Sequence, residues 1–294
     1  MILLLAVSLV WAFSFGIVKR YLSGLDPTAV AAMRLLVSLV VFAPLFRFSR
    51  VGARRTASLA LIGAVQFGAV YVLYLRSYRY LHAYEVALFT ITTPLFVMLF
   101  DAAAARRWRM RYLAAALLSV AGAALLEWTP SIAPGVVRGF VLMQLSNACF
   151  AAGQVAWRAE RRRIPAGVPD ASVFAATYAG ALALTLAVSA FTTAWGSFSP
   201  GRAQWAAIVF LGAVASGLGF FLWNVGATRV NAGTLAAFNN AKIPLGIAVS
   251  LLVFGERADI ARLLAGGAVM AAGVWIAGRG AGGQSKDRPQ VRRA

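Results

Sequence analysis

One lysine stands inside an apolar stretch in the C-terminal part of the chain. Lys242 lies about 11 residues into the stretch 232–254, roughly 16 Å deep in a helix that rises about 1.5 Å per residue. A charge at mid-membrane costs about 2.5–3.5 kcal/mol on insertion scales, so Lys242 is expected to face a cavity. Phe238 and Asn239 share its helix face, and the three groups suit a small carboxylate with an apolar or aromatic body. Alternatively, Lys242 pairs with a buried carbonyl or carboxylate and only holds helices together.

A second group of polar side chains lies on one face of the stretch 82–101. Glu85 has His82 three residues before it and Phe89 four residues after it, and Thr92 and Thr93 continue that face. Glu85 could bind a ligand's ammonium group or carry a proton. The alternative is an interfacial carboxylate paired with an arginine of the preceding loop. His82 alone is more often a helix-end residue than a ligand-binding one.

Further aromatic and polar side chains are spread over several apolar stretches. In a membrane protein they could line a polar pathway, although each alone is more often a packing or lipid-facing residue. Arg34 lies about 10 Å into its stretch, where a structural ion pair or a helix-end contact is favoured over contact with a ligand. The other pathway candidates are Trp11, Phe15, Tyr74, Tyr78, Trp157, Trp223 and Asn224.

Composition indicates which elements position these side chains. The 294 residues are 61% hydrophobic and 13% charged, whereas soluble globular domains contain about 45–50% and about 25%. This excess is too large for one buried core and predicts an all-α membrane protein with many spans. The net charge of +19 sits in short runs between apolar stretches, as topology signals do, so nucleic-acid binding is not expected.

The chain offers few groups for catalysis or metal binding. One cysteine and one histidine exclude a disulfide within one chain and a site with several histidines. No catalytic Ser/His pair, pair of aspartates or metal-binding set is visible at membrane depth, so we expect neither an enzyme nor a cofactor. Met1 leads directly into apolar residues without a cleavage pattern, which predicts an uncleaved first span.

Ten apolar stretches of about 18 to 24 residues are each long enough to cross a bilayer as a helix. Of the 28 Lys and Arg residues, 18 fall on the side of the termini and 8 on the other, with Arg34 and Lys242 inside spans. This asymmetry predicts that both termini are cytoplasmic. The expected spans are 2–18, 28–46, 57–77, 82–101, 112–128, 137–157, 172–194, 204–226, 232–254 and 260–278.

The spans form two sets of five that register when the chain is shifted by 150 residues. Pro94 then falls on Pro244, and Arg79 falls on Arg229. Because five is odd, the second set enters the membrane in the opposite direction, a plan that is frequent in secondary transporters. The expected units are two inverted five-helix repeats at 1–130 and 131–280, followed by a disordered basic cytoplasmic tail at 281–294.

Three short motifs point to a known family. They are Trp11 with Lys19 eight residues later, Pro27 with Arg34, and the segment from Pro244 to Gly255-Glu256. With these motifs the chain resembles the EamA-type transporters of the drug/metabolite transporter superfamily. It departs from their pattern in the first half, where Ala105-Arg106 stands at the position of Gly255-Glu256. The resemblance implies a ten-span carrier similar to bacterial amino-acid and metabolite exporters.

These observations predict a secondary transporter of the bacterial cytoplasmic membrane. It is expected to export amino acids with aromatic or other apolar side chains, and related small metabolites, by alternating access. Its partners would be the amino-acid-like substrate and the lipid bilayer; a monomer is expected, with a homodimer as the alternative. The competing functions are a multidrug or other-solute carrier, for cationic drugs or nucleotide sugars, and an uncoupled facilitator.

Overall fold

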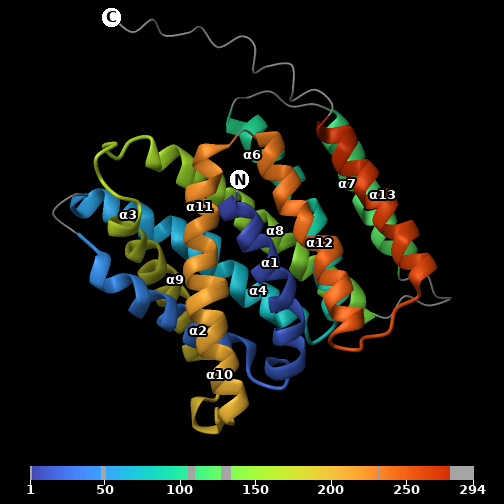
Figure 1. The fold of residues 1–294 in the computed structure, drawn as a ribbon, viewed down its shortest axis with the longest axis horizontal. Helices are drawn as coiled ribbons and strands as arrows, with labels where there is room; N and C mark the ends of the chain where they lie inside the picture. The colour runs from blue at the N-terminus through green and yellow to red at the C-terminus, as the bar shows by residue number, and fades with distance from the viewer. Residues whose placement is uncertain (1, 48–50, 105–109, 127–133, 231, 279–294) are drawn as a thin grey trace, which may run out of the picture.

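The protein is a helical bundle in the part of the chain that its computed structural model describes, residues 2–47, 51–104, 110–126, 134–230 and 232–278. All regular structure in these ranges is helical, which confirms the predicted all-α class. Helix α1 lies near the centre of the view in Figure 1, and α7 and α13 run together along one side. The predicted tail, 281–294, lies outside the described residues.

The helices follow one another through short connections. The α-helices are α1 (Ile2–Ile17), α2 (Pro27–Phe42), α3 (Gly52–Gly63), α4 (Val70–Ser77), α5 (Ala83–Phe89), α6 (Thr93–Ala104), α7 (Met110–Leu126), α8 (Pro134–Arg161), α9 (Ala171–Thr192), α10 (Arg202–Phe210), α11 (Gly219–Arg229), α12 (Ala232–Leu252) and α13 (Ile260–Gly278). Three π-helical segments extend or join them: η1 (Val18–Leu22), η4 (Ala64–Ala69) and η7 (Leu211–Leu218). The shorter 3-10 turns are η2 (Ala43–Leu45), η5 (Thr90–Thr92) and η6 (Trp195–Ser197).

Seven helical segments are long and apolar enough to cross a bilayer, and the chain is a multi-pass membrane protein. Helices α7, α12 and α13 coincide with the other three predicted spans but are not among the seven, so ten crossings stay a prediction. The seven segments are Ile2–Leu22, Pro27–Leu45, Gly52–Ser77, Ala83–Ala103, Gly135–Arg161, Ala171–Thr192 and Arg202–Arg229.

Helices from the two ends of the chain pack directly against each other. Helix α1 contacts α12, α2 contacts α9 and η7, and α4 contacts α8. Neither half of the sequence therefore forms its interior alone. A space enclosed at the centre of the bundle must be lined by residues from both halves.

The contact between α3 and α9 depends on glycine. A Cβ atom on Gly180 would lie 1.9 Å from the carbonyl oxygen of Ala60, and one on Gly63 would lie 1.8 Å from that of Thr177. Two backbones approach this closely only where a side chain is absent, as in other packed membrane helices. The two glycines therefore set the distance between α3 and α9.

We predict that Gly180→Leu lowers the free energy of unfolding by roughly 1–3 kcal/mol or more, because the new side chain would have to displace backbone. Thermal unfolding of the purified protein in detergent measures this. Gly196→Ala is the matched control, since nothing lies within 4 Å of its Cβ position. Equal midpoints for the two variants would show that the α3–α9 contact is not close-packed.

Candidate functional site

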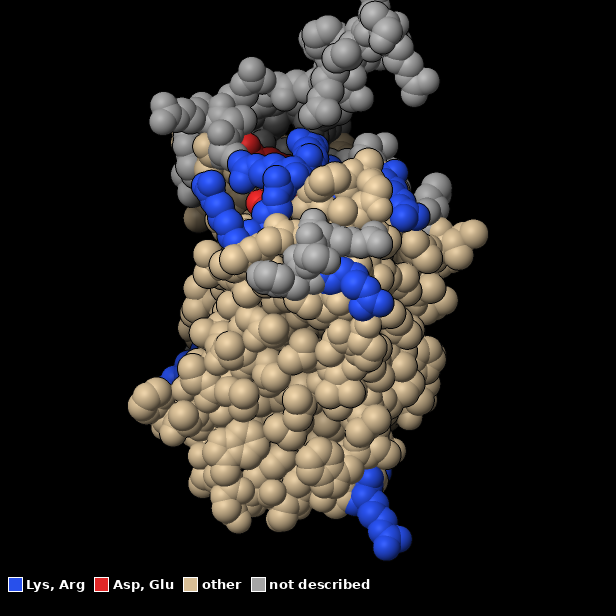
Figure 2. Space-filling view, turned by 90° about the vertical axis from the view of Figure 1, so that its left-hand side faces the viewer, with Lys and Arg blue, Asp and Glu red and all other residues tan. Residues whose placement is uncertain are grey.

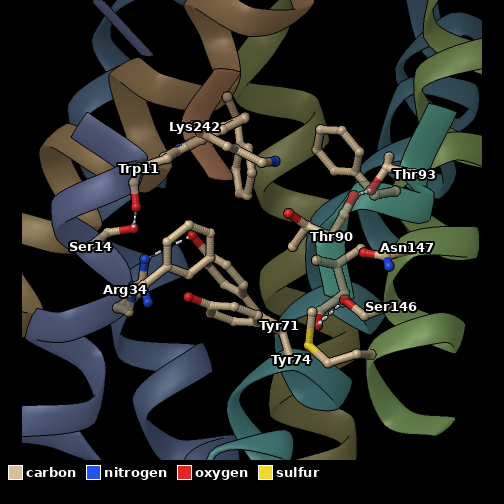
Figure 3. A pocket seen from close by; sticks show the side chains of 15 residues that line it. Trp11, Ser14, Arg34, Tyr71, Tyr74, Thr90, Thr93, Ser146, Asn147 and Lys242 are labelled. Carbon is tan, nitrogen blue, oxygen red and sulfur yellow. Dashed lines mark hydrogen bonds between the residues drawn. The ribbon is translucent and has the colours of Figure 1, made fainter. Parts of the chain in front are cut away.

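A cavity lies at the centre of the bundle, where α1, α2, α4, α8, α11 and α12 meet (Figure 3). The space between its side chains amounts to about 590 Å³, including the part that meets solvent. Both halves of the chain contribute to its wall. The lining residues are Trp11, Ser14, Phe15, Arg34, Val70, Tyr71, Tyr74, Thr90, Thr93, Met143, Ser146, Asn147, Phe150, Phe220 and Lys242.

Lys242 reaches the cavity from α12 and meets an aromatic ring from α1. Its side chain is buried, and its Nζ lies 4.9 Å from the centroid of the Trp11 ring. The same Nζ donates a hydrogen bond to Oδ1 of Asn239, 3.3 Å away. These partners orient the ammonium group but are neutral, so its charge stays available to a ligand in the cavity.

Arg34 lines the cavity from α2 and is only 2% exposed. Its Nη2 donates to the hydroxyl of Tyr71 at 2.9 Å and to Oγ of Ser216 at 3.1 Å. Its guanidinium carbon lies 4.5 Å from the centroid of the Tyr71 ring. The structural ion pair considered from the sequence, alongside a helix-end contact, is not among the ion pairs of the described residues.

The π-helical segment η7 fixes the groups behind this part of the wall. Its carbonyl groups accept hydrogen bonds from side chains: that of Ala215 from Nε1 of Trp11 at 2.9 Å, and that of Gly217 from the hydroxyl of Tyr178 at 2.6 Å. Oγ of Ser216 donates to the carbonyl of Leu211 at 2.8 Å. A π-helical turn of this kind often marks a functional site, and here it positions both Trp11 and a partner of Arg34.

The opposite wall presents hydroxyl and amide groups from the α5–α6 junction and α8 (Figure 3). Nδ2 of Asn147 donates to the carbonyl of Phe89 at 2.8 Å and to Oγ1 of Thr92 at 3.0 Å. Oγ1 of Thr90 donates to the carbonyl of Ala87 at 2.8 Å. These groups retain acceptor capacity toward a ligand.

The cavity combines aromatic surface with positive charge. Two of its lining residues are cationic, and none of the described residues that line it is Asp or Glu. Aromatic rings suit an apolar ring system, whereas the cations suit an anion. The arrangement favours an organic anion with an apolar body and further hydrogen-bonding groups.

The residues predicted from the sequence lie at different distances from this cavity. Those that line it are Trp11, Phe15, Tyr74, Thr93 and Lys242. Three others hold lining residues in place. Asn239 bonds Lys242, Thr92 bonds Asn147, and the hydroxyl of Tyr78 lies 2.7 Å from that of Tyr74.

Five more of the predicted residues pack behind the wall. The ring of Trp223 lies 5.2 Å from that of Trp11, and its Nε1 donates to Oε1 of Gln154 at 2.8 Å. Asn224 accepts from Nε2 of Gln66 at 3.1 Å. The remaining three, which pack against other aromatic rings or the core, are Phe89, Trp157 and Phe238.

His82 and Glu85 lie outside the cavity, at the start of α5. The His82 side chain is 57% exposed and stacks on Tyr84. The Glu85 carboxylate is buried and accepts the backbone N–H of His82 at 2.5 Å. Glu85 therefore caps its own helix. Arg79, from the loop that was expected to supply a partner for Glu85, pairs instead with Asp26 at 3.8 Å.

Sequence reasoning missed most of the hydroxyl and amide groups of the wall, including Tyr71, Thr90, Ser146 and Asn147. Tyr71 and Tyr74 are three residues apart on α4, so their shared face was a usable signal. Single Ser and Thr residues in apolar spans carry no such signal, because they also bond their own helix backbone.

Glu256, in the loop after α12, joins the two halves at the start of α5. Its carboxylate accepts the backbone N–H groups of Ala83 and Tyr84 at 3.0 and 3.2 Å. Ser250 also donates to it, and Nδ1 of His82 lies 3.8 Å away. Burial tends to raise the pKa of this carboxyl, but the three hydrogen bonds and the nearby His82 ring outweigh burial and lower the pKa to about 2. Gly255, at φ +68°, makes the turn that brings Glu256 here.

Comparison with known proteins identifies relatives along the whole chain. Residues 1–128 and 137–279 each match the profile of the EamA-like transporter family. A probable biotin transporter of Pseudomonas aeruginosa is 41% identical over 280 residues, which cover 93% of this chain and 96% of that protein. Biotin transporters of Escherichia coli K12 and Salmonella typhimurium are 36% and 34% identical, and each match covers 94% of this chain and 92% of the relative.

A protein crystal structure with a similar fold superposes with a TM-score of 0.63. The match covers 93% of this chain and 95% of that one, at 22% sequence identity. At this identity the likeness concerns the fold alone.

We predict that Glu256→Gln destabilises the protein near neutral pH by about 1–3 kcal/mol, because it weakens charge-assisted bonds to α5. The folded pKa is depressed, so the stabilisation is present above about 4.5 and is lost as the pH falls from there toward 2. The thermal midpoints of the wild-type protein and Glu256→Gln, measured between pH 7 and pH 3, should converge as the pH falls.

Asp259→Asn is the control for the Glu256 experiment. Asp259 is exposed, pairs with Arg262 at 3.2 Å and accepts its backbone N–H. An exposed pair contributes little, and asparagine caps a helix as well as aspartate does. If Glu256→Gln shifts the thermal midpoint from that of the wild-type protein as little as Asp259→Asn does, the contacts assigned to Glu256 are contradicted.

Proposed function

The chain belongs to the EamA-like transporter family, and on this premise we propose that it carries biotin across the bacterial cytoplasmic membrane. It is a multi-pass transporter of a small metabolite, and it is not an enzyme. The choice of biotin rests on relatives 34–41% identical that are named biotin or probable biotin transporters. The central cavity supports it, because it has aromatic walls and two buried cations, with no acid among its described lining residues.

Biotin matches the groups that line this cavity. It is a monocarboxylate whose fused rings are largely apolar and carry a ureido group. The carboxylate would bind Nζ of Lys242 through a charge-assisted hydrogen bond. The rings would contact aromatic side chains such as Phe15 and Phe220, and the ureido group would bond the hydroxyl and amide groups around Thr90 and Asn147.

The amino-acid export predicted from the sequence is the competing function. An amino acid also carries a carboxylate, but its ammonium group needs a negative or strongly polar partner. Glu85, considered for that role, does not line the cavity and caps α5. Arg34 and Lys242 would also repel a cationic drug. The cavity therefore favours a simple carboxylate over a zwitterion or a cation.

We also propose that the chain crosses the membrane ten times, as two inverted units at 1–130 and 131–280. The match of both halves to one family profile supports the repeat. So does the placement of π-helical turns at η4 and η7, which nearly coincide under the 150-residue shift. A cavity built from both units, near mid-membrane, is the usual arrangement for alternating access.

Both termini are proposed to face the cytoplasm. Figure 2 shows Lys and Arg side chains gathered at one end of the molecule and separated by a wide, largely uncharged band from the few at the other end. Arg55, in the first turn of α3, donates to the backbone carbonyl of Arg163, just after α8, so these two basic segments meet. The Glu256 contact would then close the outer side of the cavity. Net export and net uptake would use the same binding site.

We predict that Lys242→Met lowers the apparent affinity for biotin about 10- to 100-fold, since a charged hydrogen bond contributes about 1.5–3 kcal/mol. Uptake of radiolabelled biotin into proteoliposomes measures this. Lys242→Arg keeps the charge and should recover part of the transport. Arg202→Gln removes an exposed cation outside the cavity and should transport normally. Unchanged uptake by Lys242→Met would refute the assigned role.

Competition separates the candidate substrates. Unlabelled biotin should block uptake of labelled biotin, whereas biotin methyl ester, which lacks the charge, should compete at least about tenfold more weakly. Phenylalanine and tetraphenylphosphonium represent the amino-acid and cationic-drug alternatives and should not compete. If phenylalanine competes better than biotin, the amino-acid function replaces the one proposed here.

A further inference from the structure

Two buried cations border one cavity without an acidic partner among the described residues. Arg34 is 2% exposed and Lys242 is 6% exposed. No ion pair in the described part of the chain includes either of them. Figure 3 shows Lys242 extending into the cavity and Arg34 at its edge, beside Tyr71.

The hydrogen-bonding and aromatic partners of Arg34 are neutral, so they stabilise its charge only in part. Nη2 bonds two hydroxyl groups, and the Tyr71 ring lies beside the guanidinium. Nε and Nη1 are buried and have no hydrogen-bond partner among the described residues. Cation–π and hydroxyl contacts replace only a fraction of the hydration that a buried cation loses.

Arginine and lysine differ in how they can respond to this environment. A buried lysine can become neutral by releasing a proton, whereas arginine remains charged in proteins. The charge of Arg34 therefore persists in every state of the carrier, with and without substrate. When no carboxylate is bound, electroneutrality requires another anion close to it.

We propose that a small inorganic anion, chloride in the cell, binds in this cavity beside Arg34 and Lys242 when substrate is absent. Chloride is monovalent, abundant and small enough to enter without displacing side chains. The substrate carboxylate takes its place, because both anions balance the same cations. This inference rests on the proposed function for the identity of the carboxylate but not for the anion site itself.

The shared site makes the carrier an anion exchanger. One carboxylate crosses in one direction, and one chloride returns in the other, so one negative charge moves each way and the net charge transfer is zero. Without chloride, the empty cavity would have to reorient with an unbalanced arginine in the membrane, which is costly. Chloride on the far side of the membrane should therefore accelerate biotin transport.

The anion site is tested first without biotin. Purified protein in detergent is titrated with sodium chloride, sodium bromide or sodium gluconate at constant ionic strength, and its thermal midpoint is measured. Chloride and bromide should raise the midpoint in a saturable manner, whereas gluconate, which is too bulky, should not. Equal midpoints in all three salts would overturn the proposal.

Variants locate the anion. Arg34→Gln should abolish the chloride-dependent shift, Arg34→Lys should retain part of it, and the exposed control Arg202→Gln should retain all of it. A full shift in Arg34→Gln would place the anion elsewhere and overturn the assignment. If Arg34→Gln is not recovered as folded protein, the wild-type titration and the Lys242→Gln variant decide instead. Lys242→Gln should weaken the chloride-dependent shift of the thermal midpoint.

Exchange is tested in proteoliposomes loaded with chloride or gluconate. Labelled biotin should enter chloride-loaded vesicles at least threefold faster, with release of about one radioactive chloride per biotin and no response to an imposed membrane potential. Equal rates would overturn exchange. Chloride-dependent stability without any biotin transport would refute the proposed substrate and support the anion site. Biotin transport with no anion effect in either assay would refute the anion site alone.

Discussion

The constraint on which this structure depends is a positive charge that cannot be neutralised inside an apolar bundle. Arg34 is almost fully buried, and its bonded partners are hydroxyl groups and an aromatic ring. Such a charge is tolerated at membrane depth only where polar groups or a ligand offset it. The π-helical η7, the tyrosine on α4 and the lysine on α12 all converge on the cavity that this charge borders. The site is consequently a property of the assembled bundle and of no single helix.

The same assembly explains why the two halves of the chain cannot be separated. Backbones meet at Gly63 and Gly180, where α3 from the first half touches α9 from the second. Glu256, from the second half, holds the first residues of α5. The first contact leaves no room for side chains, whereas the second consists of hydrogen bonds that can be broken and remade. A carrier needs both kinds, because packed contacts keep helices of the two halves together at one place while polar contacts elsewhere can open.

The sequence allowed the general architecture to be predicted, because hydropathy and charge distribution follow directly from what a bilayer excludes. It also pointed to Lys242 and Trp11, since a cation in the middle of a span is costly unless it faces a polar cavity. It did not identify Thr90 or Asn147, because threonine and asparagine are common in packed helices. Their role depends on which helix face is turned toward the inside of the bundle. An ion pair or a helix-end contact was expected for Arg34, because the neutral character of its partners becomes visible only in three dimensions. For Glu85 the sequence leaves ligand binding and an interfacial role open, because helix capping and ligand binding use the same carboxylate.

The π-helical turn of η7 has a consequence for how this cavity can change over evolutionary time. A π-helical turn contains one residue more than an α-helical turn, and deletion of one residue would restore the regular α-helix. The helix on either side would keep nearly its present phase, because the wider turn is what accommodates the extra residue, whereas side chains and carbonyl groups within the turn would change their facing. Ser216 would no longer face Arg34, and the carbonyl that holds Trp11 would point elsewhere. Insertion or loss of a single codon could therefore alter substrate preference in one step, without any substitution in the wall of the cavity.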